Sequence, residues 1–281
     1  MTRPGDARFT ERTPRVAAAR RLTRRGERTD AGLFLAEGAQ GVREALRRDG
    51  TVTELFGTPA ALAQHAGLAA AAERAGVAVS AVTGRGMAGL SETVTPQGLV
   101  AVCRFVDVPL AAALHPPEQV PPRLVALLAA VRDPGNAGTV LRTADAAGAD
   151  AVLFSTASVD PYNGKCVRAS AGSLFHLPVV RAVDPAQAVD ALRAAGLRVL
   201  AAAGDGEADL DDLADGGALA GPTGWLFGNE ARGLPDELAA LADTRVRIPI
   251  YGRAESLNLA AAAAVCLYVS ARSQRVRPEG G

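Results

Sequence analysis

The residue types best suited to chemistry gather in three short segments of the carboxyl-terminal half. The first segment, residues 133–138, has the sequence Asp-Pro-Gly-Asn-Ala-Gly and leads into a predicted helix. Its two glycines are expected to allow a sharp turn, and Asn136 with the helix start offers hydrogen-bond donors to an anion. Arg142 lies four residues past Gly138, so its guanidinium is expected to reach back to the same loop. A capped helix with an exposed arginine explains this segment equally well.

The second segment follows the apolar strand predicted at residues 225–227. It places Asn229 and Glu230 between Gly228 and Gly233. A carboxylate at the end of an apolar strand is poorly explained by packing, because glutamate is seldom buried without a partner. Open α/β sheets bind ligands at the carboxyl ends of their strands, so this position favours a site.

The third segment begins at Ile248 and continues through Glu-Ser-Leu-Asn-Leu, which opens an alanine-rich helix predicted at 257–272. Ser256 is expected to cap that helix, which accounts for a serine at its start. Capping by Ser256 does not account for Asn258, a polar residue facing an otherwise apolar surface.

A fourth pattern is weaker. Residues 84–89 match the Gly-x-Gly-x-x-Gly pattern of dinucleotide-binding loops. The residues beyond it contain Pro96 and no long helix on which a pyrophosphate could sit, and no strand-anchored acid follows for the ribose. We therefore interpret residues 84–89 as an ordinary loop and keep the dinucleotide enzyme as a minor alternative.

The elements that must position these segments fall into two regions. Residues 31–108 read as a small α/β unit, with strands at 34–36, 52–56, 77–82 and 99–105 and helices at 37–48 and 60–75. Four prolines within residues 116–122 indicate a stiff linker. After Arg123 strands alternate with helices, which predicts a parallel sheet covered by helices. The expected domains are therefore residues 1–108, a linker at 109–122 and residues 123–281.

Composition excludes several classes of protein. The 281 residues carry 30 basic and 30 acidic side chains, but residues 1–30 hold nine Arg against four acids. This imbalance predicts a basic amino-terminal arm for nucleic acid or, as readily, a solvated tail. The three cysteines and three histidines are scattered, which argues against a disulfide framework and a zinc site and fits a reducing cytoplasm. Neither a membrane helix nor a secretory signal is expected.

Taken together, the three segments resemble the signature motifs of the SpoU/TrmH branch of the SPOUT methyltransferases. The matching stretches are Asn136–Ala144, Gly228–Leu234 and Ile248–Ala260, with residues 168–175 between them. Upstream, Phe34–Gly38 and Thr93–Gly98 are similar to the substrate-binding domain of this family. The resemblance covers residues 15–272 or so.

The resemblance implies a fold, a reaction and a set of site residues. The implied fold is α/β, a parallel sheet flanked by helices with a carboxyl-terminal trefoil knot, preceded by a small ribosomal-protein-like RNA-binding domain. The implied reaction transfers a methyl group from S-adenosylmethionine to a ribose 2′-hydroxyl of RNA. The expected catalytic residues are Arg142, Asn136, Glu230, Ser256 and Asn258. The expected cofactor-binding residues are Gly228, Ile248, Leu257, Ser256 and Asn258, and the expected RNA-binding residues are Arg168, Arg20, Arg21, Arg24 and Arg25.

Two proton acceptors are conceivable for this reaction. The family's key residue at the position of Arg142 is often proposed as the base. A guanidinium has a pKa above about 12, so Arg142 is better interpreted as an electrostatic stabiliser that grips the phosphate beside the target ribose. Glu230 is the alternative acceptor, and no metal is required.

The substrate is expected to be ribosomal RNA, most readily 23S rRNA, because of the two-domain layout. Transfer RNA and a catalytically silent RNA-binding module on the same scaffold are the alternatives. The family also implies a homodimer, and a cytoplasmic location is expected. The target nucleotide, and whether its methylation serves housekeeping or antibiotic resistance, lie beyond the sequence.

Overall fold

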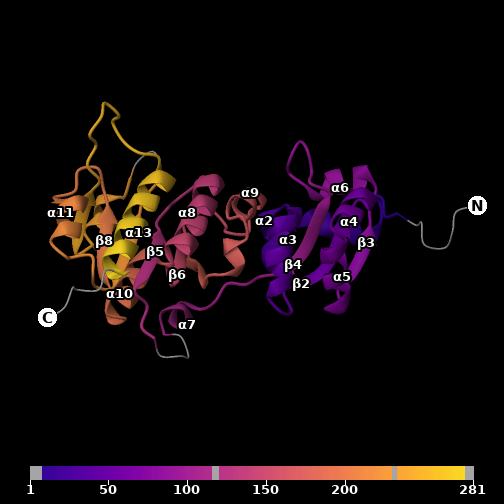
Figure 1. Cartoon of the computed structure of the whole chain (residues 1–281), viewed down its shortest axis with the longest axis horizontal. Coiled ribbons are helices and arrows are strands. Elements are labelled where there is room, and N and C mark those ends of the chain that lie inside the picture. Colours follow the sequence, from indigo (N-terminus) through magenta and orange to yellow (C-terminus); the bar gives the residue numbers. More distant parts are fainter. Residues whose placement is uncertain (1–7, 116–119, 230–232, 276–281) are drawn as a thin grey trace, which may run out of the picture. The chain divides into compact units, whose positions relative to one another are not determined.

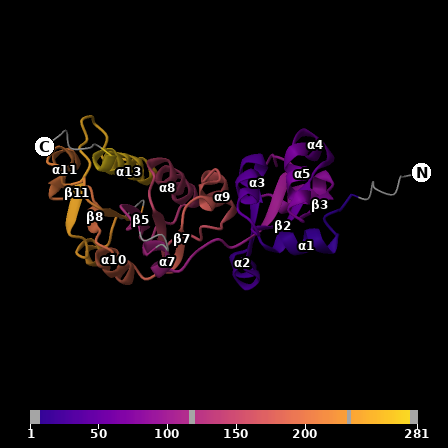
Figure 2. The same ribbon diagram turned by 60° about the horizontal axis from the view of Figure 1, so that its bottom comes forward.

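The computed structural model describes residues 8–115, 120–229 and 233–275. They belong to two compact units, each with its own sheet (Figures 1 and 2). The first unit comprises residues up to Val106 together with a later segment, Tyr162–His176. The second unit comprises Asp107–Pro161 and the residues from Leu177 onward.

The first unit is built on a four-stranded sheet in the order β1-β4-β2-β3. Strand β4 is antiparallel to both of its neighbours, whereas β2 and β3 are parallel. Every residue of β4 except the last is buried, as its continuous apolar run predicts. The strands are β1 (Leu33–Glu37), β2 (Val52–Gly57), β3 (Ala78–Ala81) and β4 (Leu99–Arg104).

Helices cover both faces of this sheet. Helices α3 and α5 pack on one side, while α1 and α6 contact each other over a cluster that includes Val16, Met87 and Val100. The helices are α1 (Pro14–Arg21), α2 (Arg25–Ala31), α3 (Gly38–Arg47), α4 (Pro59–Gln64), α5 (Ala66–Arg74) and α6 (Gly84–Leu90).

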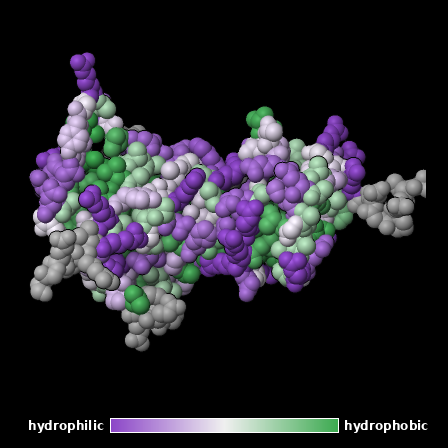
Figure 3. All heavy atoms as spheres, in the orientation of Figure 1, coloured by the Kyte–Doolittle hydropathy of each residue, from purple (hydrophilic) through white to green (hydrophobic). Residues whose placement is uncertain are grey.

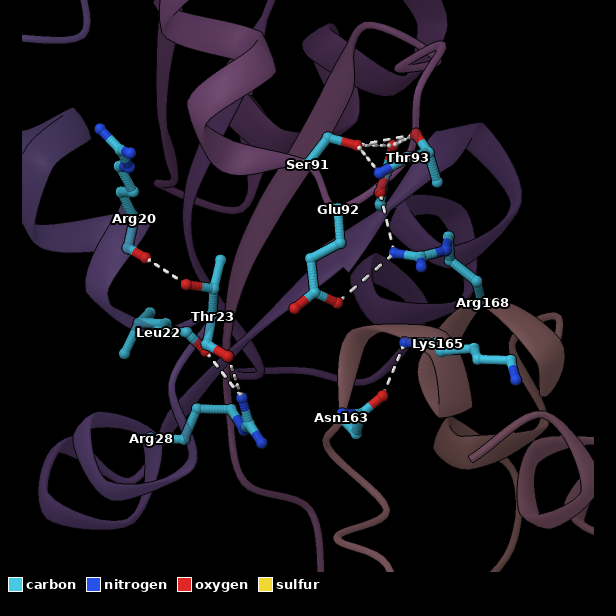
Figure 4. Close-up of polar contacts among 11 residues, drawn as sticks. Arg20, Leu22, Thr23, Arg28, Ser91, Glu92, Thr93, Asn163, Lys165 and Arg168 are labelled. Carbon is cyan, nitrogen blue, oxygen red and sulfur yellow. Dashed lines mark hydrogen bonds and ion pairs between the residues drawn. The ribbon is translucent and has the colours of Figure 1, made fainter. Parts of the chain in front are cut away.

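The expected basic arm is wrong for the described residues, because they fold into α1 and α2. Val16, Ala19 and Leu22 are buried in the core of the first unit. Arg28 is buried as well, and its guanidinium donates to the carbonyl oxygens of Leu22 and Thr23 at 3.0 Å each (Figure 4). These carbonyls at the end of α1 lack helical partners, so the buried arginine satisfies them.

Two further expectations for the first unit need correction. Residues 84–89 form the short helix α6 rather than a loop, and the Thr83 hydroxyl caps it by accepting from the Gly86 amide at 3.1 Å. The helix expected at 60–75 is broken at His65 into α4 and α5.

The segment Tyr162–His176 packs with the first unit although the sequence assigns it to the second domain. The Tyr162 ring stacks on Phe105 with centroids 4.1 Å apart, and its hydroxyl accepts from the Val106 amide at 2.7 Å. Phe175 stacks on Phe34 at 6.0 Å. The segment contains α9 (Gly164–Ala169) and the 3₁₀ helix η1 (Ser173–Phe175).

The second unit contains a seven-stranded parallel sheet in the order β7-β6-β5-β10-β8-β11-β9. Strands β5, β6 and β10 are wholly buried, as expected where helices cover both faces. The strands are β5 (Leu124–Leu128), β6 (Ala151–Ser155), β7 (Val179–Val183), β8 (Arg198–Ala202), β9 (Ala208–Asp209), β10 (Thr223–Phe227) and β11 (Thr244–Arg247).

Helices α8 and α13 pack side by side on one face of this sheet, and α7 and α10 cover the other (Figures 1 and 2). The Trp225 indole donates to the buried Ser270 hydroxyl at 2.8 Å, which fastens α13 to β10. The helices are α7 (Leu110–Leu114), α8 (Pro134–Ala147), α10 (Pro185–Ala194), α11 (Leu210–Asp215), α12 (Asp236–Ala239) and α13 (Leu259–Arg275). Part of the linker expected at residues 109–122 thus forms the helix α7.

All three cysteines are free and buried. Among the described residues, no helix is long and apolar enough to cross a membrane. The same residues contain no group of three or more His, Cys, Asp or Glu side chains that could hold a metal ion.

Candidate functional site

Two of the three sequence segments line one pocket at the carboxyl ends of the parallel strands. The pocket encloses about 320 Å³, within the range of roughly 300–1,000 Å³ that is usual for small-molecule sites. Its walls combine apolar side chains with backbone at the ends of three strands, β8, β10 and β11. The lining residues are Ala202, Ala203, Gly204, Phe227, Gly228, Asn229, Gly233, Val246, Ile248, Ile250, Glu255, Ser256, Leu257, Leu259 and Ala262.

Gly228 lies where the second segment folds back on itself. The Asn229 amide donates to the Gly233 carbonyl at 2.8 Å, and the Gly233 amide donates to the Asn229 carbonyl at 2.9 Å. A Cβ atom at Gly228 would lie only 2.4 Å from the Gly233 carbonyl carbon. Because that neighbour is backbone, no side-chain rotation relieves the contact, and only glycine fits.

The carbonyl of Ala130 connects the second segment with the loop that precedes the first segment. The Asn229 side-chain amide donates to this carbonyl at 3.1 Å. Ala130 has φ +59°, a left-handed conformation that costs an alanine about 1–2 kcal/mol. Its amide donates to the Ser155 hydroxyl at 3.0 Å, so both backbone polar groups of Ala130 are hydrogen-bonded.

A buried pair of serines supports the same loop from β6. The Ser158 hydroxyl donates to the Leu128 carbonyl at 2.7 Å and accepts from the Val131 amide at 3.2 Å. It also lies 3.0 Å from the Ser155 hydroxyl. These bonds fix the path of residues 129–131, which decides where α8 begins.

The third segment meets the first through two asparagines. The Asn258 side-chain amide donates to the Asn136 side-chain oxygen at 3.2 Å. The Asn258 side-chain oxygen accepts from the Ala260 amide at 2.9 Å, so Asn258 caps α13. The prediction that Ser256 caps α13 is therefore wrong. Asn258, the polar residue that the sequence left unexplained, caps this helix instead.

The start of α8 also differs from expectation. The helix begins at Pro134 and is capped by Asp133, whose carboxylate accepts from the Asn136 amide at 2.8 Å. Within the described residues, neither Gly135 nor Gly138 has a positive φ, so the sharp turn expected from these glycines is absent. They lie inside the helix instead.

Arg142 consequently lies in the third turn of α8 rather than the first. At 1.5 Å per residue it stands about 9 Å further along the axis than Asn136. Its side chain is exposed, and none of the described residues forms a hydrogen bond or ion pair with it.

The loop between β11 and α13 forms the outer wall of the pocket and stands out from the second unit in Figure 1. The Tyr251 hydroxyl donates to the Asp211 carboxylate at 2.5 Å, and this bond raises the pKa of Tyr251. Ile250, Tyr251 and Leu257 are exposed. Figure 3 shows hydrophobic surface at the base of this loop.

The remaining site residues are dispersed. Glu230 lies outside the described residues. Arg168 is in the first unit, where its guanidinium donates to the Glu37 carboxylate at 3.2 Å and lies 4.0 Å from Glu92 (Figure 4). Four arginines expected to bind RNA are exposed on α1, α2 and the turn between them: Arg20, Arg21, Arg24 and Arg25.

Comparisons with known proteins agree with this architecture. Residues 123–268 match the SpoU rRNA Methylase family, and residues 13–101 match the MRM3-like substrate binding domain. The chain belongs to the SpoU rRNA Methylase family. The resemblance predicted from the three segments is confirmed, as is the parallel sheet flanked by helices behind a substrate-binding domain.

Relatives of the SpoU family resemble the chain over almost its whole length. The 23S rRNA (guanosine(2553)-2′-O)-methyltransferase RlmP of Bacillus subtilis is 36% identical over 89% of this chain and 92% of its own length. The AdoMet-bound rRNA methyltransferase of Sinorhizobium meliloti superposes with a TM-score of 0.78 at 34% identity, over 95% of this chain and 97% of that one. AviRb of Streptomyces viridochromogenes with AdoMet gives 0.80 at 31% identity, over 94% and 98%.

The cofactor of the chain is S-adenosylmethionine, and the pocket suits it. The adenine is a flat apolar ring with polar edges, so it requires apolar walls and backbone hydrogen-bonding groups. Phe227, Val246 and Leu259 supply such walls, and the backbone of the lining glycines 204, 228 and 233 supplies the groups. This cofactor has no phosphate, and none of the described residues that line the pocket is basic.

Sequence reasoning missed several residues of this site. Ala202, Ala203 and Gly204 line the pocket directly after β8, where the strand-end rule could have found them. Asn229 lies in the second segment, but no role in the site was predicted for it. Ser158 gave no signal, because a serine three residues past a strand is common.

Replacing Asn258 with alanine is expected to weaken both cofactor binding and turnover. The change removes the α13 cap, worth about 1 kcal/mol, and the bond to Asn136. We expect S-adenosylmethionine affinity to fall about 5–10-fold by titration calorimetry, with a similar or larger loss in kcat. Ser256→Ala is the control for capping and should leave the melting temperature unchanged. An Asn258→Ala protein with wild-type affinity and rate would contradict this role.

Proposed function

We propose that this chain transfers a methyl group from S-adenosylmethionine to a ribose 2′-hydroxyl of 23S rRNA. Membership of the SpoU family makes it an S-adenosylmethionine-dependent RNA 2′-O-methyltransferase. The observation that carries the proposal is that the second and third segments line one pocket, while the first segment is joined to the third by the bond between Asn136 and Asn258.

The charge distribution supports RNA binding by the first unit. The stretches Met1–Val106 and Tyr162–His176 contain 17 Arg and Lys against 10 Asp and Glu. The second unit has 13 against 20, so a neutral chain divides into a basic and an acidic part. A basic domain attracts the phosphate backbone, which positions an RNA without reading its sequence.

Large-subunit rRNA is favoured over tRNA by the named relatives. RlmP of Bacillus subtilis is named for a guanosine of 23S rRNA, and the first unit matches the MRM3-like substrate binding domain. The test is methyl transfer from tritiated S-adenosylmethionine to unmodified 23S rRNA, 16S rRNA and tRNA. We expect incorporation at one ribose of 23S rRNA. Incorporation into tRNA alone, or into a base, would contradict the proposal.

The residues of the pocket and of α8 have separate tasks in this reaction. When bound, S-adenosylmethionine supplies a methyl group already activated on a sulfonium. The exposed Arg142 guanidinium grips the phosphate beside the target ribose and favours the developing alkoxide. Asn136 and Asn258, joined to each other, hold the start of α8 against the start of α13. Ser256 and Leu257 form part of the pocket wall.

The proton acceptor is assigned to Glu230 by elimination between the two candidates. A guanidinium keeps its proton in proteins, so it serves poorly as a base. A carboxylate next to the pocket residue Asn229 accepts a proton from a hydroxyl that Arg142 polarises. Glu230→Gln, assayed for kcat at saturating substrates, tests this role.

Homodimerisation is also proposed. Val265 and Tyr268, about one turn apart on α13, are exposed in the single chain and form a short apolar stripe. Such a stripe on a helix packed next to the pocket suits a second copy of the chain. Sedimentation equilibrium of the wild type and of Tyr268→Asp measures the oligomeric state of each protein.

Two related proposals, and the test of an alternative, follow from the family. We retain the trefoil knot as a prediction for the region that ends in α13. A cytoplasmic location follows from a ribosomal substrate. The alternative of a silent RNA-binding module is separated by calorimetry, because such a module need not bind S-adenosylmethionine.

The exposed arginines of the first unit are expected to set the salt dependence of RNA binding. Deleting residues 1–28 would remove the buried Val16, so substitution is the better test. In Arg24→Gln/Arg25→Gln we expect weaker RNA binding and a slope of log affinity against log salt that is shallower by about 0.7–2. The control, Arg193→Gln/Arg198→Gln, removes two exposed charges of the second unit. Equal slopes in both double variants would contradict the assignment.

A further inference from the structure

We propose that loop 91–98 of the first unit is an RNA-contacting surface and that Glu37 is the residue that positions it. This inference rests on the proposed function, since it names the part of the first unit that meets the RNA. It explains two sequence motifs that the catalytic site does not use, Phe34–Gly38 and Thr93–Gly98.

Glu37 fixes the first end of the loop. Its side chain is only 6% exposed, and its carboxylate accepts from the Ser91 hydroxyl at 2.5 Å and from the Thr93 hydroxyl at 3.0 Å. Arg168 donates to the same carboxylate at 3.2 Å. Figure 4 shows Ser91, Thr93 and Arg168 drawn together around this point. One nearly buried carboxylate therefore holds the loop and an RNA-binding candidate at once.

Gly38 and Gly98 fix the second end. Gly38 has φ +88°, and the Gln97 side chain occupies the place of its missing Cβ, which would lie 2.5 Å from the Gln97 amide oxygen. Gly98 has φ +82°, and its carbonyl accepts from the Thr58 amide at 2.9 Å. The loop is thus held at both ends, although it contains no helix or strand of its own.

The loop presents Val94 wholly to solvent, with a relative exposure of 103%, beside the exposed Thr95. A single exposed valine is unremarkable on a surface. Here, however, it lies at the tip of a loop that the fold anchors with a charged group and two glycines. Such anchoring stabilises a surface shape rather than a core.

The surroundings of the loop identify RNA as its partner. Arg168 and the exposed Lys165 lie beside it on α9, and the Arg20 side chain packs near Gly89 just before it. The whole unit carries an excess of seven positive charges. An exposed apolar side chain and a hydroxyl on a basic unit match the sugar faces, base edges and phosphates of a folded RNA.

The substitution Glu37→Gln gives a test in which two accounts predict opposite signs. It removes a negative charge, so simple electrostatics predicts tighter RNA binding. If Glu37 positions the loop and Arg168, losing the carboxylate loosens both, and binding weakens by about 5–10-fold because a preorganised contact is lost. KM for RNA should rise while kcat at saturating RNA and S-adenosylmethionine affinity stay unchanged. Glu37→Asp is expected to restore part of the loss.

Matched variants separate the loop from the fold. Glu92→Gln removes an exposed carboxylate 4.0 Å from the same arginine and should leave RNA affinity equal or slightly higher. Val94→Asp changes a fully exposed side chain, so we expect the unit to stay folded and RNA binding to weaken about 10-fold. Val120→Asp, at an exposed valine of the second unit, should have a smaller effect.

Each outcome of these binding measurements either supports or overturns the inference. Weaker binding in Glu37→Gln and Val94→Asp, with unchanged Glu92→Gln, supports the inference. Wild-type or tighter RNA binding in Glu37→Gln, or an unaffected Val94→Asp, overturns it while leaving the proposed function intact. If Glu37→Gln loses its thermal transition, Val94→Asp alone decides. A wild-type protein that binds no rRNA overturns the proposed function and the inference together.

Discussion

An Arg142→Ala protein is expected to lose methyl transfer, with kcat lower by about 100–1,000-fold, while its S-adenosylmethionine affinity stays within a few fold of wild type. Arg142 is exposed in the third turn of α8 and does not line the cofactor pocket. Removing one preorganised charge that meets the developing alkoxide typically costs two to three orders of magnitude in rate. The loss should therefore appear in kcat.

Single-turnover methylation and calorimetry on the same preparation measure the two quantities. Arg142→Lys keeps the charge but loses the planar fork, so it should recover only part of the rate. Arg272→Ala is the matched control, because it removes an exposed arginine from α13. Retained turnover in Arg142→Ala would remove the arginine from its role, and a large loss of cofactor affinity would assign it to binding.

A Gly228→Ala protein is expected to lose S-adenosylmethionine binding by at least about 100-fold. The new methyl group would lie 2.4 Å from the backbone of Gly233, so the paired turn between Asn229 and Gly233 must open. Opening it also displaces the Asn229 side chain from the Ala130 carbonyl. The cofactor pocket and the loop before α8 should therefore both change.

Gly204→Ala is the control for this prediction. Gly204 lines the same pocket, but a Cβ atom there meets nothing within 4 Å. Calorimetry should show at most a few-fold change for Gly204→Ala and no measurable heat for Gly228→Ala. Equal affinities in the two variants would show that the turn at Gly228 does not shape the pocket.

The second unit was predictable from sequence because its strands are continuous apolar runs. Residues 225–227 were expected as a strand, and β10 lies there. The amino-terminal helices were not expected, since α1 buries only Val16 and Ala19 and is otherwise rich in arginine. A short apolar face among so many charges does not stand out in a pattern.

The site was predictable in its parts but not in its connections. The pocket does contain Gly228, Ile248, Ser256 and Leu257, whose binding roles stay predictions. The hydrogen bonds among Asn229, Ala130 and Ser155 join residues far apart in the chain, and no local pattern encodes them. The capping role moved from Ser256 to Asn258 because the helix begins two residues later than expected.

Association of Tyr162–His176 with the first unit is another long-range effect. The segment is held there by the stacking of the Tyr162 ring on Phe105 and by the ion pair between Arg168 and Glu37. A sequence read along one domain gives no reason to assign an internal segment to the other unit. The same ion pair places an arginine of the SpoU-matched region beside loop 91–98.

Hydrogen–deuterium exchange with and without S-adenosylmethionine tests the central claim most directly. If one pocket formed by separate segments holds the methyl donor, exchange should slow together at residues 203–204, 228–229 and 255–259. Residues 84–89 should be unaffected. Protection confined to one of these segments, or found at 84–89 instead, would contradict the claim that they form a single cofactor site.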